Sequence, residues 1–285
     1  MPLAPTRSIR GLPVPAFLYG TAWKEERTRE LTAQAISAGF RGIDTANQRK
    51  HYLEAAVGEA VVSAIARGEV TRAELFLQSK FTSLGGQDRR LPYDATAAPA
   101  TQVAQSFAST LEHFQTDYLD SYVLHGPSSD TGLTEEDTAA WRAMEALARD
   151  GKARLLGVSN VSREQLRILL DFAEIPPAFV QNRCYARTGW DASVRECCAA
   201  NGVAYQGFSL LTANRRELER PEVQRILKRT GRTLPEVVFR FAIELGILPL
   251  TGTSKRKHLE LDLGCFELEL ESAEIDALSR LDGTR

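Results

Sequence analysis

Several features that would place a protein in a specialised class are missing from this 285-residue sequence. The four cysteines, Cys184, Cys197, Cys198 and Cys265, have no C-x-x-C spacing, so we expect reduced thiols. No apolar run approaches the ~20 residues of a membrane span. Residues 1–8 also lack the apolar segment of a secretory signal. We therefore expect a soluble, cytoplasmic protein that does not bind membranes.

An excess of charge of one sign is also missing. The chain has 35 Lys plus Arg, 37 Asp plus Glu and a net charge of −2. Without a basic run, the sequence excludes a general electrostatic surface for nucleic acid. The four histidines (51, 113, 125 and 258) lack the close spacing of metal ligands, so no metal site is expected.

What the sequence does contain is a regular alternation of short apolar runs and longer segments of helical periodicity. Four helical segments end at a glycine that an apolar run closely follows: Gly39, Gly151, Gly202 and Gly246. Glycine supplies the left-handed residue that closes a helix, and a strand so soon afterwards is typical of a repeated strand–helix unit. The runs predict eight strands, at residues 17–20, 41–44, 75–79, 119–124, 154–158, 178–181, 203–207 and 247–250.

The predicted strands are apolar throughout, which is typical of a parallel sheet covered by helices. Eight such units in a chain of this length predict a (β/α)8 TIM barrel that forms one domain over residues 1–285. Residues 6–15 are expected to form a short β-hairpin that caps one end. A doubly wound open sheet is the alternative, but no G-x-G-x-x-G follows any strand.

The predicted strand ends bring polar groups to one rim, where barrel enzymes carry out their chemistry. Asp44 ends the second strand, Lys80 the third and His125 the fourth. Such groups are costly inside a barrel unless they pair or reach solvent at its mouth. An ion pair that closes the barrel would explain any one of them, but all three together favour a functional site. Tyr52, in the loop after Asp44, favours catalysis, because a lysine lowers the pKa of a nearby tyrosine. A proton donor without a nucleophile or metal calls for an external hydride donor.

The sequence resembles the aldo-keto reductase family over nearly its whole length. The matching segments are Tyr19-Gly-Thr-Ala-Trp23, Gly39-Phe-Arg-Gly-Ile-Asp-Thr-Ala46, Val57-Gly58, Gln78-Ser-Lys80, Asp117-Tyr-Leu-Asp-Ser-Tyr-Val-Leu-His125 and Gly157-Val-Ser-Asn160. The resemblance implies NADPH-dependent reduction of aldehydes or ketones, or the reverse oxidation of alcohols. It also implies a small carbonyl compound as substrate.

The resemblance implies a role for individual residues. Tyr52 would donate the proton, Lys80 and Asp44 would modulate it, and His125 would orient the carbonyl. The implied cofactor-binding residues are Thr21, Ser159, Asn160, Gln181, Phe208, Ser209, Leu210, Thr251, Ser254 and Arg256. A short tail ending at Arg285 implies an open substrate pocket, bounded by Trp23, Tyr93 and Tyr185.

The sequence departs from the family at two places. The family usually has its tyrosine five residues after the aspartate, where Arg49 stands here. Tyr52 comes eight residues after Asp44 and resembles a branch with a longer Lys-His-Tyr loop, which leaves His51 as the alternative proton donor. Leu250 stands where many members have a lysine for the 2′-phosphate. Arg256 remains and can pair with a phosphate, so NADPH is favoured over NADH.

Two other functions remain open at this point. The same barrel is compatible with an NADPH-binding regulatory subunit or sensor that has little turnover. A barrel hydrolase or lyase with a Schiff base on Lys80 is also compatible with Asp44 and Tyr52 nearby.

Overall fold

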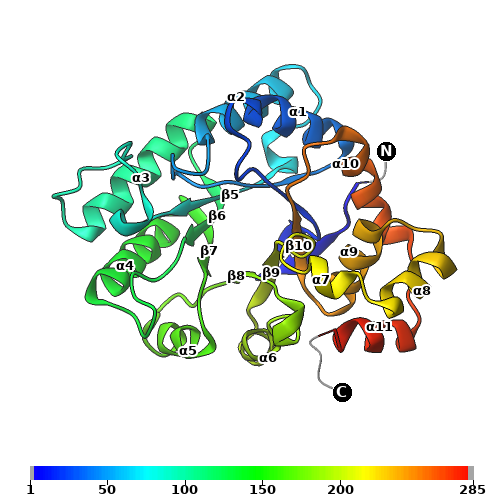
Figure 1. Cartoon of the computed structure of the whole chain (residues 1–285). Coiled ribbons are helices and arrows are strands. Elements are labelled where there is room, and N and C mark those ends of the chain that lie inside the picture. Colours follow the sequence, from blue (N-terminus) through cyan, green and yellow to red (C-terminus); the bar gives the residue numbers. More distant parts are fainter. Residues whose placement is uncertain (1–2, 282–285) are drawn as a thin grey trace.

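A computed structural model describes residues 3–281 of the chain (Figure 1). Met1, Pro2 and the end of the expected short tail, residues 282–285, lie outside the described residues. Eight parallel strands close into a barrel in the order β10-β3-β4-β5-β6-β7-β8-β9. These strands are β3 (Leu18–Gly20), β4 (Gly42–Asp44), β5 (Phe76–Phe81), β6 (Leu119–Leu124), β7 (Ala153–Ser159), β8 (Phe179–Arg183), β9 (Ala204–Phe208) and β10 (Leu248–Thr251). The predicted (β/α)8 barrel is confirmed.

Helices surround the barrel on its outer face (Figure 1). The α-helices are α1 (Thr28–Ala38), α2 (Glu54–Ala66), α3 (Pro99–Phe114), α4 (Glu135–Arg149), α5 (Arg163–Phe172), α6 (Ala192–Ala200), α7 (Arg215–Leu218), α8 (Pro221–Thr230), α9 (Leu234–Glu244), α10 (Arg256–Leu263) and α11 (Ser272–Ser279). Short 3-10 turns are η1 (Glu25–Arg27), η2 (Arg72–Glu74), η3 (Leu84–Gly86), η4 (Ala186–Thr188) and η5 (Gly264–Glu267). The four glycines predicted to close helices all have a positive φ, from 63° to 112°.

An N-terminal hairpin closes the amino-terminal end of the barrel. Strands β1 (Thr6–Ile9) and β2 (Leu12–Pro15) pair antiparallel, as predicted. Val14 belongs to a small apolar cluster with residues from the starts of the barrel strands, including Phe76 and Phe179. The hairpin leaves the opposite end of the barrel, where the strands have their carboxyl ends, free for a site.

The four cysteines are buried and unpaired. Burial raises the pKa of the Cys184 and Cys198 thiols to about 12, so neither forms a thiolate readily. Among the helices within residues 3–281, none has both the length and the apolar character needed to cross a membrane.

Candidate active site

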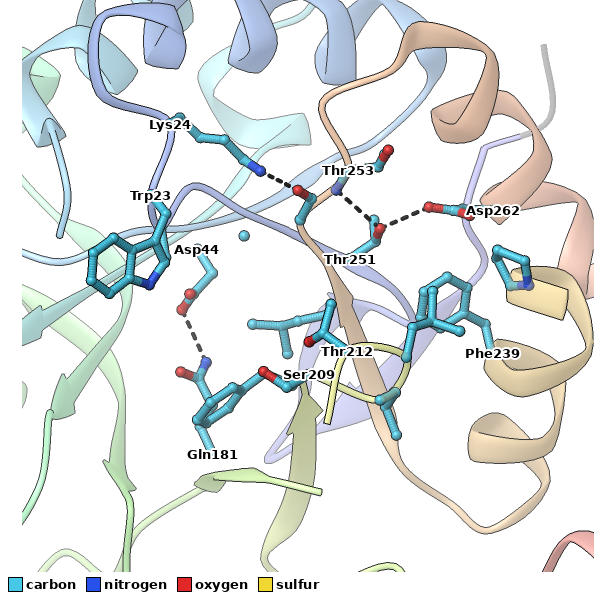
Figure 2. A pocket seen from close by; sticks show the side chains of 18 of the residues that line it. Trp23, Lys24, Asp44, Gln181, Ser209, Thr212, Phe239, Thr251, Thr253 and Asp262 are labelled. Atoms are coloured by element: carbon cyan, nitrogen blue, oxygen red, sulfur yellow. Dashed lines mark hydrogen bonds between the residues drawn. The ribbon is translucent and has the colours of Figure 1, made fainter. Parts of the chain in front are cut away.

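A cavity of about 460 Å³ opens among the carboxyl ends of the strands (Figure 2). It begins at the ends of β4 and β6 and extends to β10, α9 and α10. Eleven residues singled out from the sequence line it: Trp23, Asp44, Tyr52, His125, Ser159, Asn160, Gln181, Phe208, Ser209, Leu210 and Thr251. The strand-end residues therefore share one concave space.

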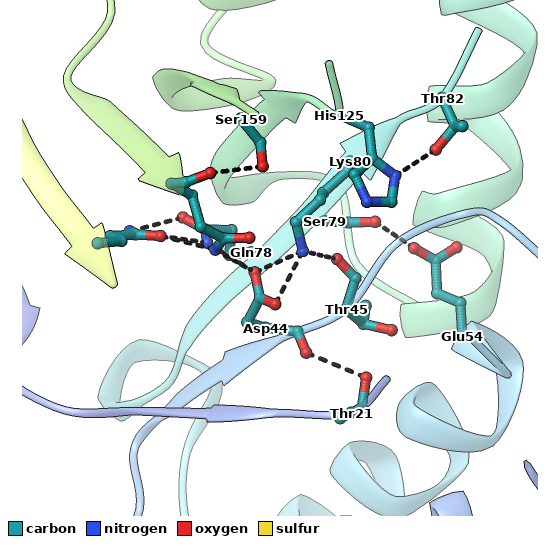
Figure 3. A network of polar contacts seen from close by, with 12 residues as sticks. Thr21, Asp44, Thr45, Glu54, Gln78, Ser79, Lys80, Thr82, His125 and Ser159 are labelled. Atoms are coloured by element: carbon teal, nitrogen blue, oxygen red, sulfur yellow. Dashed lines mark hydrogen bonds and ion pairs between the residues drawn. The ribbon is translucent and has the colours of Figure 1, made fainter. Parts of the chain in front are cut away.

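Lys80 lies beneath the floor of this cavity and is fully buried. Its Nζ is 2.7 and 2.8 Å from the two carboxylate oxygens of Asp44 and donates to the Thr45 carbonyl at 2.8 Å (Figure 3). Burial lowers the pKa of Lys80, and the charge of Asp44 opposes that shift. Because its three donor positions are taken and it does not line the cavity, Lys80 is poorly placed to form a Schiff base.

Tyr52 reaches the cavity from the loop between β4 and α2. Its ring centroid lies 5.3 Å from Lys80 Nζ and 5.9 Å from the His125 ring. We expected Lys80 to lower the pKa of Tyr52, but burial and then the charge of Asp44 raise it instead. The Lys80 ammonium is already compensated by Asp44, so it gives a phenolate little net attraction, while burial penalises that phenolate.

His51, the alternative proton donor, points elsewhere. Its ring stacks on the Trp23 ring with 4.0 Å between centroids, and the backbone N–H of Trp23 donates to the backbone carbonyl of His51 at 2.8 Å. His51 is not among the residues that line the cavity, whereas Tyr52 is. Trp23 itself is 68% exposed at the rim. Of the two candidates, the structure brings Tyr52 to the other polar residues.

His125 follows β6 and lies over Lys80. Its Nδ1 is 2.6 Å from the Thr82 hydroxyl (Figure 3). Burial, with the nearby charges of Lys80 and His51, lowers the pKa of His125 to about 3. The imidazole is therefore neutral near pH 7, with one ring nitrogen able to donate and the other to accept.

Polar groups from β7 and β8 form the next part of the wall. The Ser159 hydroxyl donates to the Gln181 carbonyl at 2.6 Å, and Asn160 Nδ2 donates to the His125 carbonyl at 2.8 Å. The Gln181 side chain donates to Asp44 at 3.0 Å. Phe208, at the end of β9, places an aromatic ring on the same wall. Amide groups beside an aromatic face suit a planar, polar ring such as nicotinamide.

Six of the sequence-predicted residues do not line the cavity: Lys80, Thr21, Tyr93, Tyr185, Ser254 and Arg256. Thr21 is buried and its hydroxyl donates to the Asp44 carbonyl at 3.0 Å. Ser254 and Arg256 are exposed, and Arg256 lies 3.6 Å from Glu260.

The expected wall of Tyr93 and Tyr185 is corrected by the structure. Tyr93 is buried against Phe81, with its hydroxyl donating to the Thr82 carbonyl at 2.8 Å. Tyr185 lies under the guanidinium of Arg187, 4.2 Å from its ring centroid. The Tyr93 ring is buried in the core and the Tyr185 ring is paired with a cation, so neither side chain lines the cavity.

Sequence reasoning missed residues at the far end of the cavity, among them Lys24, Thr253, His258 and Asp262. Asp262 is buried and accepts a hydrogen bond from the Thr251 hydroxyl at 2.7 Å; burial raises its pKa to about 7. Lys24 Nζ donates to the Gly252 carbonyl across the cavity (Figure 2). The spacing of His258 and Asp262, four residues apart on one helix face, was the available signal.

The arrangement within residues 3–281 includes no group of three His, Cys, Asp or Glu side chains able to hold a metal ion. Among the side chains that line the cavity, the Tyr52 hydroxyl and the His125 imidazole can donate a proton or a hydrogen bond to an oxygen atom.

Comparison with known proteins gives consistent matches. The sequence pattern of the aldo/keto reductase family matches residues 17–282. A glyoxal reductase of Bacillus subtilis is 30% identical over 275 residues, which cover 95% of this chain and 90% of that protein. An aldo-keto reductase of Mycolicibacterium smegmatis is 30% identical over 96% of this chain and 89% of that protein. A Bombyx mori aldo-keto reductase, solved in complex with NADP, has a TM-score of 0.84 at 23% identity, over 99% of this chain and 94% of that one.

Proposed function

Because the chain belongs to the aldo/keto reductase family, which confirms the resemblance in its sequence, we propose that it reduces aldehydes or ketones to alcohols with NADPH. The observation that carries the proposal is the convergence of Tyr52 and His125 above the Asp44–Lys80 pair, at one end of an elongated cavity. A phenol and a neutral imidazole suit a carbonyl oxygen that must accept a hydrogen bond and then a proton.

The cavity fits a nicotinamide cofactor. Ser159, Asn160 and Gln181 offer hydroxyl and amide groups for a carboxamide, and Phe208 offers a ring face. The far end offers hydroxyls and the Lys24 ammonium, which suits the charged part of a dinucleotide. The solved Bombyx mori relative was crystallised with NADP, which supports the phosphorylated form. When bound, the reduced nicotinamide supplies a hydride to a carbonyl carbon.

Two residues of this chain, His125 and Tyr52, donate a hydrogen bond and a proton to the oxygen atom of the substrate. In the tautomer that this proposal needs, Nδ1 of the neutral His125 accepts from the Thr82 hydroxyl, and Nε2–H donates to the carbonyl oxygen. Tyr52 stays protonated across the working range because its pKa is raised. An alkoxide is a stronger base than a phenolate, so the proton passes from the Tyr52 hydroxyl to the oxygen. Lys80 then lies beside the tyrosinate until solvent returns the proton.

The test compares the wild type with Tyr52→Phe, using NADPH consumption with an activated aromatic aldehyde. We expect kcat to fall by about 10²- to 10⁴-fold, the usual contribution of a positioned acid. The affinity for NADPH, measured by calorimetry, should be unchanged because the ring remains. Tyr205→Phe is the matched control: its buried hydroxyl donates to Asp191 at 2.8 Å away from the cavity, and kcat should stay within about twofold of the wild type.

The other results have distinct meanings. If Tyr52→Phe retains the wild-type kcat, Tyr52 is not the proton donor, and His51→Gln becomes the next variant to measure. If the wild type binds NADPH tightly but reduces no aldehyde or ketone, a regulatory subunit or sensor replaces the proposal.

A further inference from the structure

A second buried carboxylate lies behind the candidate site, and the proposed reaction does not use it. Glu54 begins α2 two residues after Tyr52, and its side chain is only 2% exposed. It accepts hydrogen bonds from the hydroxyls of Ser79 and Thr110, the latter at 3.1 Å, and lies 2.7 Å from Nδ1 of His113. A buried carboxylate is costly without such partners, so this cluster is a specific feature of the fold.

A close approach of two helices brings the His113 imidazole to Glu54. Gly58 lies one turn after Glu54 on α2, and a Cβ there would come within 1.8 Å of the His113 carbonyl oxygen. The absence of that Cβ lets the last turn of α3 lie against α2. His113, with its side chain 30% exposed, is the solvent-facing member of the pair.

Glu54 also connects the two segments that carry the proposed proton donor and its lysine. Ser79 directly precedes Lys80 in β5, and adjacent strand residues point to opposite faces. Lys80 therefore faces Asp44 inside the barrel while Ser79 faces Glu54 outside it (Figure 3). Because Glu54 follows Tyr52 so closely, one carboxylate holds the end of the Tyr52 loop against β5.

Charged and titratable groups lie near Glu54 on each neighbouring element. His113 on α3 is in direct contact with Glu54, and Glu112 acts on His113 from the same helix. Lys80 on β5, which points to the other face of its strand, and Tyr122 on β6 feel only the charge of Glu54. The hydrogen bond to Glu54 raises the pKa of His113. The charge of Glu54 in turn favours the protonated forms of Lys80 and Tyr122. The histidine is thus the group in this cluster that changes charge nearest to neutral pH.

We propose that Glu54 is a positioning residue for Tyr52 and Lys80, and that His113 is its titratable counter-charge, so that carbonyl reduction depends on the charge of His113. This inference rests on the proposed function. When His113 loses its proton, the buried charge of Glu54 is no longer compensated and acts more strongly on Lys80. The uncompensated charge of Glu54 then adds to that of Asp44 in opposing the formation of the Tyr52 phenolate.

The first test is His113→Gln, which keeps a hydrogen-bond donor and removes the charge. At pH 6 we expect kcat for carbonyl reduction to fall about three- to tenfold, because a tenfold change corresponds to one pKa unit of interaction. KM for NADPH should stay the same. The difference from the wild type should shrink as pH rises and His113 of the wild type also loses its charge.

Two further variants complete the design. Ser79→Ala removes the hydrogen bond that joins Glu54 to β5 and keeps the charges of Glu54 and His113. We therefore expect kcat to fall at every pH. Glu145→Gln is the matched control, because Glu145 is also a fully buried carboxylate with an arginine partner, Arg142, but lies on α4. Its variant should lose stability and keep the pH profile of kcat.

The outcomes separate this inference from the proposed function. A kcat of His113→Gln that equals the wild type at every pH, or is lower by one constant factor, overturns the role of the His113 charge. A wild type that reduces no carbonyl compound overturns the proposed function. In that case NMR titration of His113 still tests the pair, because Glu54→Gln must lower its pKa; an unchanged pKa overturns the pairing.

Discussion

His125 is a residue whose surroundings remove its charge near neutral pH. Nδ1 of the ring is 2.6 Å from the Thr82 hydroxyl, and partial burial and the charge of Lys80 both disfavour an imidazolium. A charged imidazole would be repelled by the nearby charge of Lys80. The neutral ring keeps one N–H for a ligand, so burial here serves the chemistry as well as packing.

The lowered pKa of His125 predicts a loss of stability in acid. The folded-state pKa is about 3, and an unfolded histidine has a pKa of about 6.5. Below pH 6.5 the unfolded chain therefore binds a proton that the folded chain does not, and stability falls until pH reaches about 3. Near pH 5 we expect this proton uptake to lower the free energy of unfolding by about 2 kcal/mol.

The measurement is urea unfolding of the wild type and His125→Gln between pH 7 and pH 4.5. The variant has no such proton to bind, so its stability should decline less steeply over this range. Parallel declines of the two proteins would contradict the neutral state of His125.

At the scale of elements, the position of a strand was easier to predict than the contacts of a loop. Apolar runs and closing glycines located β3–β10 because burial on both faces dictates the residue types directly. Strand ends then placed Asp44 and His125 at one rim. Tyr93 was misplaced because its ring packs on Phe81, a contact made by tertiary packing that no local pattern encodes. Asp262 was missed because it projects from α10, beyond the strand ends.

The contact between α2 and α3 gives a prediction for an element. In an isolated helix Gly→Ala is favourable by about 1 kcal/mol. In Gly58→Ala the new Cβ would meet the His113 carbonyl at 1.8 Å, so the helices must separate. We expect a net loss of about 1–3 kcal/mol, as for other overpacked sites, measured by urea unfolding.

Gly85→Ala serves as the control for this prediction, because nothing lies within 4 Å of a Cβ at Gly85. Its stability should stay near that of the wild type. A Gly58→Ala protein as stable as the wild type would show that α2 and α3 are not in close contact.

At the scale of the whole molecule, one end of the barrel is sealed and the other carries the cavity. The hairpin seals the amino-terminal end with apolar side chains from β1 and β2 and from the strand starts. The carboxyl end carries the cavity, and its wall is made from seven of the eight barrel strands or the segments that follow them, together with α9 and α10. A ligand bound there contacts segments spread along most of the chain, so its binding energy stabilises the closed barrel as a unit.

This arrangement predicts one unfolding transition that NADPH shifts as a whole. If residues 1–285 form a single cooperative domain, a ligand that binds only the folded state stabilises all of it. At a free concentration of 100 times its Kd, such a ligand raises the free energy of unfolding by about 2.7 kcal/mol. In thermal unfolding, a single transition should therefore move to higher temperature as NADPH is added. Tyr52→Phe should show the same shift, because the proposed role of Tyr52 is proton donation and not cofactor binding. Two transitions, of which NADPH moves only one, would show that the chain contains separate folding units.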